Sequence, residues 1–149
     1  MLEALKEAIK TTSYGDVPIG CVIVKDRIII GRGYNQVEKC GNSLAHSEII
    51  AINEAIKNIN YKHLLDCELY TTLEPCPMCA GAIVSARIKK LVYGASDPKS
   101  GYCGSLHNTV LDERLNHNCI IEKGVLEKEC SDLLKDFFKK LRIEKNEKR

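Results

Sequence analysis

Four side chains in two short segments have the types and spacing of a catalytic metal site. Cys76 and Cys79 form a C-x-x-C pair, a spacing at which two thiolates bind one Zn²⁺, and His46 can supply a third ligand from another segment. Three protein ligands leave the fourth position open, and water bound there has its pKa lowered to about 7, which makes it a nucleophile near neutral pH. Glu48 is not needed as a ligand and is therefore free to move protons.

The local sequence predicts that these side chains sit at helix ends. Apolar residues recur at helical spacing from Leu44 to Ile56, so the histidine and the glutamate fall in the opening turn of a helix. Cys76 directly precedes Pro77, and proline suits the first helical position, so Cys76 is predicted to be an N-cap with Cys79 in the first turn. Two helix N-termini would then converge on one site, where their positive ends stabilise thiolates and developing negative charge.

Two other kinds of site also use a C-x-x-C pair. On its own the pair is equally typical of a thioredoxin-like redox centre and of half a structural zinc site with four cysteines. A structural site needs a second close pair of ligands, but the remaining cysteines are scattered singly: Cys21, Cys40, Cys67, Cys103, Cys119 and Cys130. A redox centre explains neither His46 nor Glu48. The combined pattern therefore favours a catalytic metal site.

The elements that must position these residues alternate between helices and strands, which indicates α/β layers. Gly31 and Gly33 leave one strand and predict a bend or a close approach of backbone. Residues 36–43 are polar and predict a connecting loop. We expect helices over residues 2–9, 44–60, 76–87 and 127–142, and strands over 19–24, 28–30, 68–72, 90–93 and 120–126, the first two strands forming a hairpin.

The composition bounds the class of protein. With 149 residues, 44% of them apolar and 28% charged, the chain is expected to form a single globular domain, residues 1–149, that buries a core. It contains no run of about 18 apolar residues and no basic-then-apolar start typical of a signal peptide. We therefore expect an intracellular, cytoplasmic protein that does not enter a membrane, with its six non-ligand cysteines reduced and packed.

The pattern H-x-E followed by P-C-x-x-C is the signature of zinc-dependent nucleobase deaminases. Over nearly its whole length the chain resembles the bacterial-type tRNA adenosine deaminases of the cytidine/deoxycytidylate deaminase superfamily. The resemblance extends from Val17-Pro18-Ile19-Gly20 and Gly33-Tyr34-Asn35 through the run TLEPCPMCAGAI at 71–82, VYGASDPKSG at 92–101 and Phe137-Phe138. Many members have alanine between the histidine and the glutamate, and Ser47 keeps a small side chain there.

This resemblance implies a fold, a reaction and partners. The fold would be a three-layer α/β/α cytidine-deaminase fold with a central five-stranded mixed sheet. The reaction would convert adenosine to inosine at the first anticodon position of an arginine tRNA, with one Zn²⁺ per chain held by His46, Cys76 and Cys79 and with Glu48 as the proton shuttle. The protein would bind the tRNA anticodon loop and assemble as a homodimer.

The resemblance also suggests substrate contacts, each with a plainer alternative. In the family an asparagine at the position of Asn35 hydrogen-bonds the purine, although asparagine is also common in turns. Asp97 would lie near the ribose 2′-OH, or simply form a turn beside Pro98. Residues 135–149 hold seven Lys or Arg against three Asp or Glu; this is either a solvated tail or a phosphate-binding segment. The predicted RNA contacts there are Phe138, Lys139, Lys140 and Arg142.

Two other functions remain open at this point. A deaminase of a free base or nucleoside, such as guanine, cytosine or adenosine, would use the same zinc, the same glutamate and the same fold. A non-catalytic zinc-binding partner of such an enzyme is the second alternative. Inactive members usually lose the glutamate, and Glu48 is present, so an active enzyme is favoured.

Overall fold

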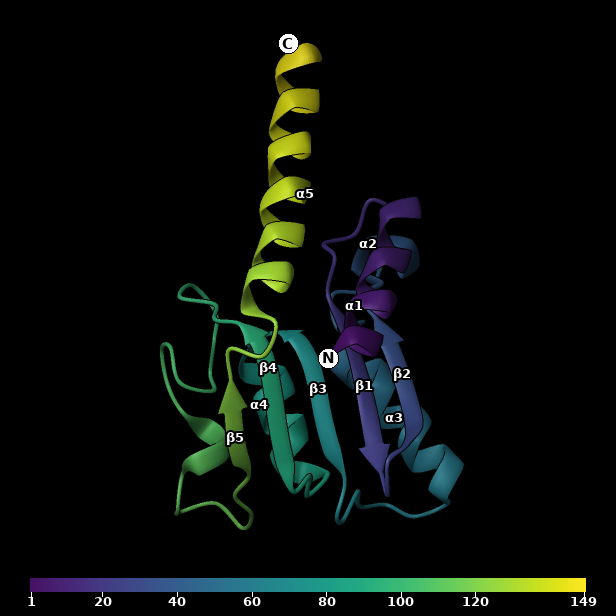
Figure 1. The fold of residues 1–149 in the computed structure, drawn as a ribbon, viewed down its shortest axis with the longest axis vertical. Coiled ribbons are helices and arrows are strands. Elements are labelled where there is room, and N and C mark those ends of the chain that lie inside the picture. Colours follow the sequence, from purple (N-terminus) through teal and green to yellow (C-terminus); the bar gives the residue numbers. More distant parts are fainter.

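The computed structural model describes residues 1–149 and contains one mixed sheet with helices on both of its faces (Figure 1). The strands lie in the order β2-β1-β3-β4-β5. β1 pairs antiparallel with β2 and with β3, whereas β3, β4 and β5 run parallel. The strands are β1 (Gly20–Lys25), β2 (Ile28–Tyr34), β3 (Glu68–Leu73), β4 (Lys90–Ala95) and β5 (Ile120–Lys123).

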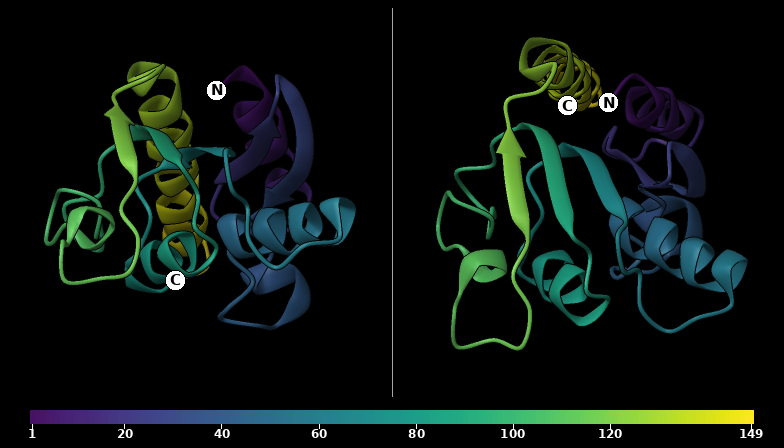
Figure 2. Two further views of the ribbon diagram at one scale, coloured as in Figure 1. Left: turned by 90° about the horizontal axis from the view of Figure 1, so that it is seen from below. Right: turned by 60° about the horizontal axis from the view of Figure 1, so that its bottom comes forward.

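The helices complete a three-layer arrangement. α1 and α5 lie on one face of the sheet, and α3 and α4 lie on the other (Figure 2). This confirms the expected α/β/α layers around a five-stranded mixed sheet. The helices are α1 (Leu2–Ile9), α2 (Val37–Cys40), α3 (Ser47–Ile59), α4 (Pro77–Ser85) and α5 (Glu127–Glu147), with short 3₁₀ segments η1 (Lys10–Ser13) and η2 (Thr109–Leu111).

The hydrophobic core lies mainly between the sheet and the helices α3 and α4. Ile23, Leu69 and Leu91 project from three neighbouring strands and are fully buried. Small residues on the helix faces, such as Ala51 and Ala80, are also fully buried and let the helices approach the sheet closely. None of the helices combines the length and the apolar character that a membrane crossing requires.

The hairpin and the close approach predicted from the glycines are confirmed. Asp26 and Arg27 form the turn between β1 and β2 with positive φ angles of 50° and 64°, as expected of a tight two-residue hairpin turn. Gly31 and Gly33 lie directly beneath the backbone of α3, where a side chain would collide with it. The start of α3, and with it His46, is therefore held tightly on β2.

The prediction of a plain loop over residues 36–43 was wrong, because Val37–Cys40 forms the short helix α2. The carboxylate of Asp16 accepts hydrogen bonds from the backbone N–H groups of Glu38 at 2.6 Å and Lys39 at 3.0 Å. It thus satisfies free donors at the start of α2 from a distant segment. Gly41, with φ 57°, ends the helix.

Several element bounds also differ from the expectation: α3 begins at Ser47 and not at residue 44, β2 continues to Tyr34, and α5 continues to Glu147. α4 ends at Ser85, short of Arg87, because Arg87 adopts a left-handed conformation with φ 58° that stops the helix. β5 ends at Lys123, so Val125 and Leu126 lie beyond it, and Leu126 with φ 51° turns the chain into α5.

No disulfide is formed, as expected, and five of the six non-ligand cysteines are buried. The expectation that all six pack inside was wrong for one of them. Cys40 is exposed, because α2 lies on the surface and contains no buried residue.

Candidate active site

Two helices on one face of the sheet begin at the same place and bring the predicted metal ligands together. His46 is the N-cap of α3 in an extended conformation, and Cys76 is the N-cap of α4 with Pro77 at the first helical position. Cys79 follows in the first turn of α4. These placements confirm that Cys76 caps α4 and that Glu48 lies in the opening turn of α3. The positive ends of both helices therefore face the cluster.

The distances between the donor atoms fit a zinc ion. Nδ1 of His46 lies 3.5 Å from Sγ of Cys76 and 3.6 Å from Sγ of Cys79. Tetrahedral zinc with ordinary bond lengths holds nitrogen and sulfur ligands about 3.6 Å apart. All three donor atoms lie within 4.8 Å of one another, and no other such group of three occurs in the structure. The residues present thus match the size and the ligand chemistry of a three-ligand zinc site.

The two thiols are electrostatically different. The pKa of Cys76 is lowered to about 4, first by the hydrogen bond from the Cys79 thiol and also by the bond to His46. The hydrogen bond that the Cys79 thiol donates to Cys76, together with burial, raises the pKa of Cys79. The hydrogen bond with Cys76 in turn raises the pKa of His46. One sulfur is therefore a ready thiolate, and the other loses its proton when a cation binds both.

Glu48 lies beside the donor cluster without being part of it. Its carboxylate accepts a hydrogen bond from Oγ of Ser47 at 3.0 Å and lies 3.5 Å from both Oγ1 of Thr71 and Sγ of Cys79. Burial raises the pKa of Glu48, because the interior disfavours its charged form. A carboxyl group whose pKa is shifted toward neutrality is suited to general acid and base catalysis.

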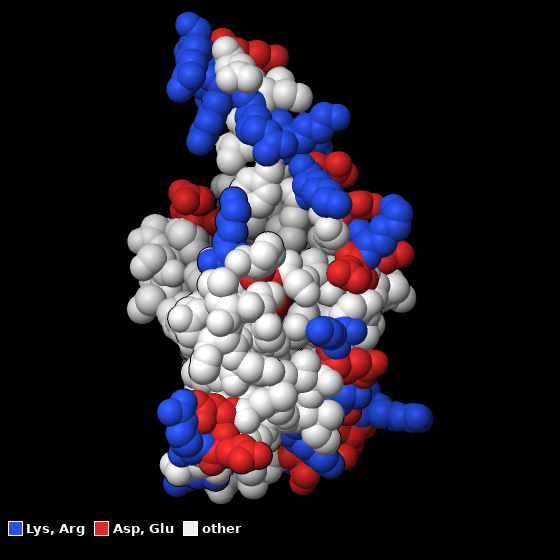
Figure 3. All heavy atoms as spheres, turned by 90° about the vertical axis from the view of Figure 1, so that its left-hand side faces the viewer, with Lys and Arg blue, Asp and Glu red and all other residues white.

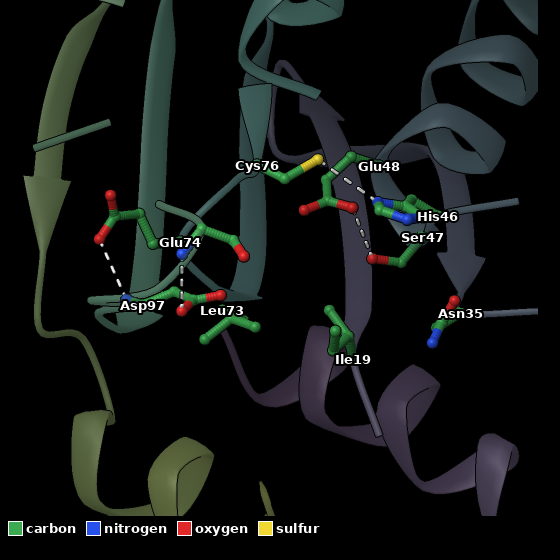
Figure 4. Close-up of a pocket in the computed structure, with 10 residues that line it drawn as sticks. Ile19, Asn35, His46, Ser47, Glu48, Leu73, Glu74, Cys76 and Asp97 are labelled. Carbon is green, nitrogen blue, oxygen red and sulfur yellow. Dashed lines mark hydrogen bonds between the residues drawn. The ribbon is translucent and has the colours of Figure 1, made fainter. Parts of the chain in front are cut away.

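The cluster opens into a solvent-accessible pocket of about 180 Å³, which is smaller than the roughly 300–1,000 Å³ typical of sites for drug-sized ligands. Asn35 and Asp97 lie on opposite sides of the pocket, with Cys76, Glu48 and His46 between them (Figure 4). The lining residues are Ile19, Asn35, His46, Ser47, Glu48, Leu73, Glu74, Cys76, Asp97 and Ser100.

Known proteins share both the sequence and the fold. A family model described as MafB19-like deaminase matches residues 1–142. A protein named tRNA-specific adenosine deaminase from Bacillus subtilis (strain 168) is 48% identical over 145 residues, which cover 97% of this chain and 90% of that protein. An equally named protein from Streptococcus pyogenes serotype M18 (strain MGAS8232) is also 48% identical, over 97% of this chain and 91% of its own.

The chain belongs to the tRNA-specific adenosine deaminase family.

Two solved structures place this family member among related deaminases. One, from a study of A-to-I editing by tRNA:A34 deaminases, has a TM-score of 0.86 at 38% identity and covers 90% of this chain and 97% of its own. It confirms the cytidine-deaminase fold. A guanine deaminase from Bacillus subtilis has a TM-score of 0.60 at 43% identity, over 64% of this chain and 61% of its own. The adenosine and guanine enzymes are thus both related to it.

The predicted base-binding residue of this family member, Asn35, is almost buried and lines the pocket. Its amide Nδ2 donates to the carbonyl oxygen of Val17 at 3.2 Å, and its Oδ1 accepts from the backbone N–H of Val37 at 3.4 Å. These bonds fix the orientation of the amide. One N–H of the amide and one lone pair of its oxygen remain available for the edge of a base.

The other predicted contact, Asp97, does form the turn that was the plainer alternative. Its Oδ1 accepts from the backbone N–H groups of Lys99 at 3.0 Å and Ser100 at 3.2 Å. The carboxylate nevertheless lines the pocket, and its second oxygen accepts no hydrogen bond from the protein. The turn and a role in binding a hydroxyl are therefore compatible.

The four C-terminal residues predicted to contact RNA are not part of the pocket. They lie on α5, which projects beyond the sheet at its far end (Figure 1), and lysine and arginine side chains gather along this projection (Figure 3). Phe138 is 41% exposed, while the neighbouring Phe137 is half-buried. Lys139, Lys140 and Arg142 are exposed and form no ion pair.

Two polar residues of the site in this family member, Ser47 and Glu74, could not be assigned a role from the sequence. Ser47 is fully buried and binds the Glu48 carboxylate, a contact that the small size of the side chain alone did not reveal. Glu74 is also buried and binds the backbone around Asp97. The available signal was a carboxylate directly after the strand and two residues before Cys76.

Proposed function

We propose that the protein hydrolyses adenosine to inosine at the wobble position of tRNA, with residues 1–149 acting as a single deaminase domain. The observation that carries this function is the buried carboxylate of Glu48 beside three zinc-type donors at the floor of an open pocket. A structural metal site would need neither the acid nor the pocket. The family relationship assigns the chemistry to an adenine base within RNA.

The reaction consumes water and adenosine and yields inosine and ammonia, so protons must move from the attacking water to the leaving amine. Zinc, when bound by His46, Cys76 and Cys79, supplies Lewis-acid activation of that water. Glu48 accepts the proton released during attack at C6 and delivers it to ring N1. It then takes the remaining proton from the new C6 hydroxyl and gives it to the amine, so that the C6–N bond breaks, ammonia leaves and the C6=O bond of inosine forms. The hydroxyl of Ser47 holds the Glu48 carboxylate in place for both steps.

Asn35 and Asp97 are proposed to bind the reacting nucleoside from two sides of the pocket. Asn35 presents a fixed amide to the purine edge, because Val17 and Val37 hold its orientation. Asp97 offers its free carboxylate oxygen to a ribose 2′-OH, a hydroxyl that DNA lacks. The base and the sugar would thus be recognised by different elements.

The exposed half of α5 is proposed to contact the anticodon loop. Phe138 can stack on an unpaired base, while Lys139, Lys140 and Arg142 neutralise phosphates. They form no ion pair within the protein, so binding phosphate breaks no internal salt bridge. An arginine tRNA as substrate and a homodimeric assembly are part of the same proposal and rest on the family resemblance.

The function is tested by incubating zinc-loaded protein with total tRNA, free adenosine, cytidine and guanine. Nucleoside analysis of the digested tRNA should reveal inosine at the first anticodon position, and Glu48→Gln protein serves as the control. Deamination of guanine with no inosine in tRNA would replace the proposal with the free-base alternative. Zinc binding without turnover of any substrate would indicate a non-catalytic partner.

A further inference from the structure

Glu74 is a buried carboxylate that no positively charged side chain neutralises. It is only 2% exposed and forms no salt bridge. Instead it accepts four hydrogen bonds from one loop. Oε2 accepts from the backbone N–H groups of Cys103 and Ser105, both at 3.1 Å. Oε1 accepts from the backbone N–H of Asp97 at 3.1 Å and from the hydroxyl of Ser105. These donors satisfy a charge that would otherwise be costly to bury.

The bonded segment, residues 97–105, is the pocket-lining loop after β4. Asp97 and Ser100 of this loop line the pocket. Gly101 lies against the carboxylate, and a Cβ atom there would be 2.1 Å from Oε2 of Glu74. The loop is thus folded around the carboxylate, and only glycine fits at the point of closest contact.

The segment that contains Glu74 also contains a predicted zinc ligand. Glu74 stands two residues before Cys76 and donates its own backbone N–H to the carbonyl oxygen of Ala95 at 2.8 Å. The next residue, Pro75, accepts from the backbone N–H of Tyr102 at 2.9 Å. The 97–105 loop is therefore attached to the short segment that holds the metal cluster.

Glu74 is not itself suited to proton transfer. Each of its carboxylate oxygens already accepts two hydrogen bonds. In Figure 4 its carboxylate lies toward the backbone of Asp97, on the side away from the His46 and Cys76 side chains. It therefore acts through the loop.

We propose that Glu74 is a positioning residue that sets the distance between the 97–105 loop and the metal cluster, and so aligns the ribose of the reacting nucleoside with the catalytic groups. This rests on the proposed function, which assigns the ribose to Asp97. Replacing the carboxylate by an amide makes its two oxygen positions different, because one becomes an NH₂ donor and the other remains an acceptor. Both partners of Oε2 are backbone donors, whereas the Ser105 hydroxyl at Oε1 can rotate and accept. In Glu74→Gln the amide NH₂ therefore takes the Oε1 position, and the Asp97 N–H loses its acceptor.

The test combines NMR amide exchange of the substrate-free, zinc-loaded protein with tRNA kinetics. In Glu74→Gln we expect the Asp97 amide to exchange about 10- to 100-fold faster, the loss of one charge-assisted hydrogen bond, while amides of the central strands are unchanged. The KM for tRNA should rise about 10-fold with the zinc content unaltered. Glu54→Gln is the matched control, because exposed Glu54 accepts a single backbone hydrogen bond, from Arg32 at 2.7 Å, outside the pocket.

Gly101→Ala provides a second variant that displaces the same carboxylate without removing it, and it should reproduce both effects. Unchanged exchange at Asp97 in both variants overturns the proposal, and this readout needs no substrate. Faster exchange with an unaltered KM makes Glu74 merely structural and also overturns it. Wild-type protein that deaminates guanine but not tRNA refutes the proposed function instead, and leaves the loop measurement interpretable.

Discussion

A Cβ atom at Gly33 would lie 2.2 Å from the carbonyl oxygen of Ser47 and 2.9 Å from the backbone nitrogen of Ala51. The backbone of β2 thus supports the first turn of α3 with no side chain between them. Because His46 caps that turn, the position of one metal ligand depends on the absence of a side chain at residue 33.

Gly33→Ala should therefore destabilise the protein by about 1–3 kcal/mol, as overpacking of a tight contact does. Thermal unfolding checks this, with about 2–4 °C lost per kcal/mol for a chain of this size. Gly81→Ala is the control, because Gly81 lies inside α4 with nothing within 4 Å of an added Cβ. That variant should gain about 0.5–1 kcal/mol from helix propensity. Equal melting temperatures for the two variants would contradict the steric argument.

Cys79→Ser should abolish stable zinc binding, because it removes one of only three protein ligands. Elemental analysis of the purified wild type should give about one zinc per chain, and the variant far less. Cys40→Ser is the matched control: Cys40 is exposed and distant from the cluster. A variant that retains full zinc would remove Cys79 from the ligand set.

Glu48→Gln should retain zinc yet lose about 10²- to 10⁴-fold in turnover, the usual contribution of a general acid–base group. The amide keeps the size of the side chain but cannot carry a proton. Metal content and inosine formation are measured on the same preparation. Loss of zinc together with activity would make Glu48 a ligand and contradict its assignment as a proton shuttle.

The same variant should be more stable than the wild type when zinc is removed, and increasingly so at higher pH. Burial raises the pKa of Glu48 in the folded state, so ionising it costs stability as the pH rises through that raised value. Below the unfolded pKa of about 4.3 the carboxyl is neutral in both states and the advantage disappears. Melting temperatures of chelator-treated wild type and Glu48→Gln between pH 4 and pH 8 test this pH dependence. A difference in melting temperature that stays constant with pH would show that ionisation of Glu48 is not its cause.

Neutral substitutions at Lys139, Lys140 and Arg142 should weaken tRNA binding and reduce its dependence on salt. Losing three phosphate contacts lowers the slope of log affinity against log salt by about 2–3. Arg27, Lys57 and Lys62 form a matched control of equal charge: Arg27 lies in the turn between β1 and β2, Lys57 in the last turn of α3 and Lys62 just after that helix, and all three are exposed. If both triple variants show the same slope of log tRNA affinity against log salt concentration, the exposed end of α5 is a solvated tail and does not bind RNA.

The metal cluster could be predicted because its signals are local. A proline after Cys76 and an apolar helical repeat after His46 fix two helix starts. α3 follows β2 and α4 follows β3, and these two strands run in the same direction because both pair antiparallel with β1, so both starts lie at the same edge of the sheet. Residues stabilised from a distance could not be predicted. The carboxylate of Asp16 binds the backbone of α2, and the carboxylate of Glu74 binds the backbone of the 97–105 loop. Neither pair of partners has a characteristic spacing in the sequence that would predict the contact.

The exposed end of α5 has an energetic consequence for any ligand that binds it. The helix has 21 residues, yet only Cys130 is buried, and every residue from 142 to 149 is exposed. Helical segments shorter than about 12–15 residues are marginal in water by themselves. Part of the binding free energy at this end is therefore spent on ordering the backbone, which lowers affinity without changing which RNA is preferred. A ligand held this way dissociates readily, a useful property in an enzyme that must release one large product before binding the next substrate.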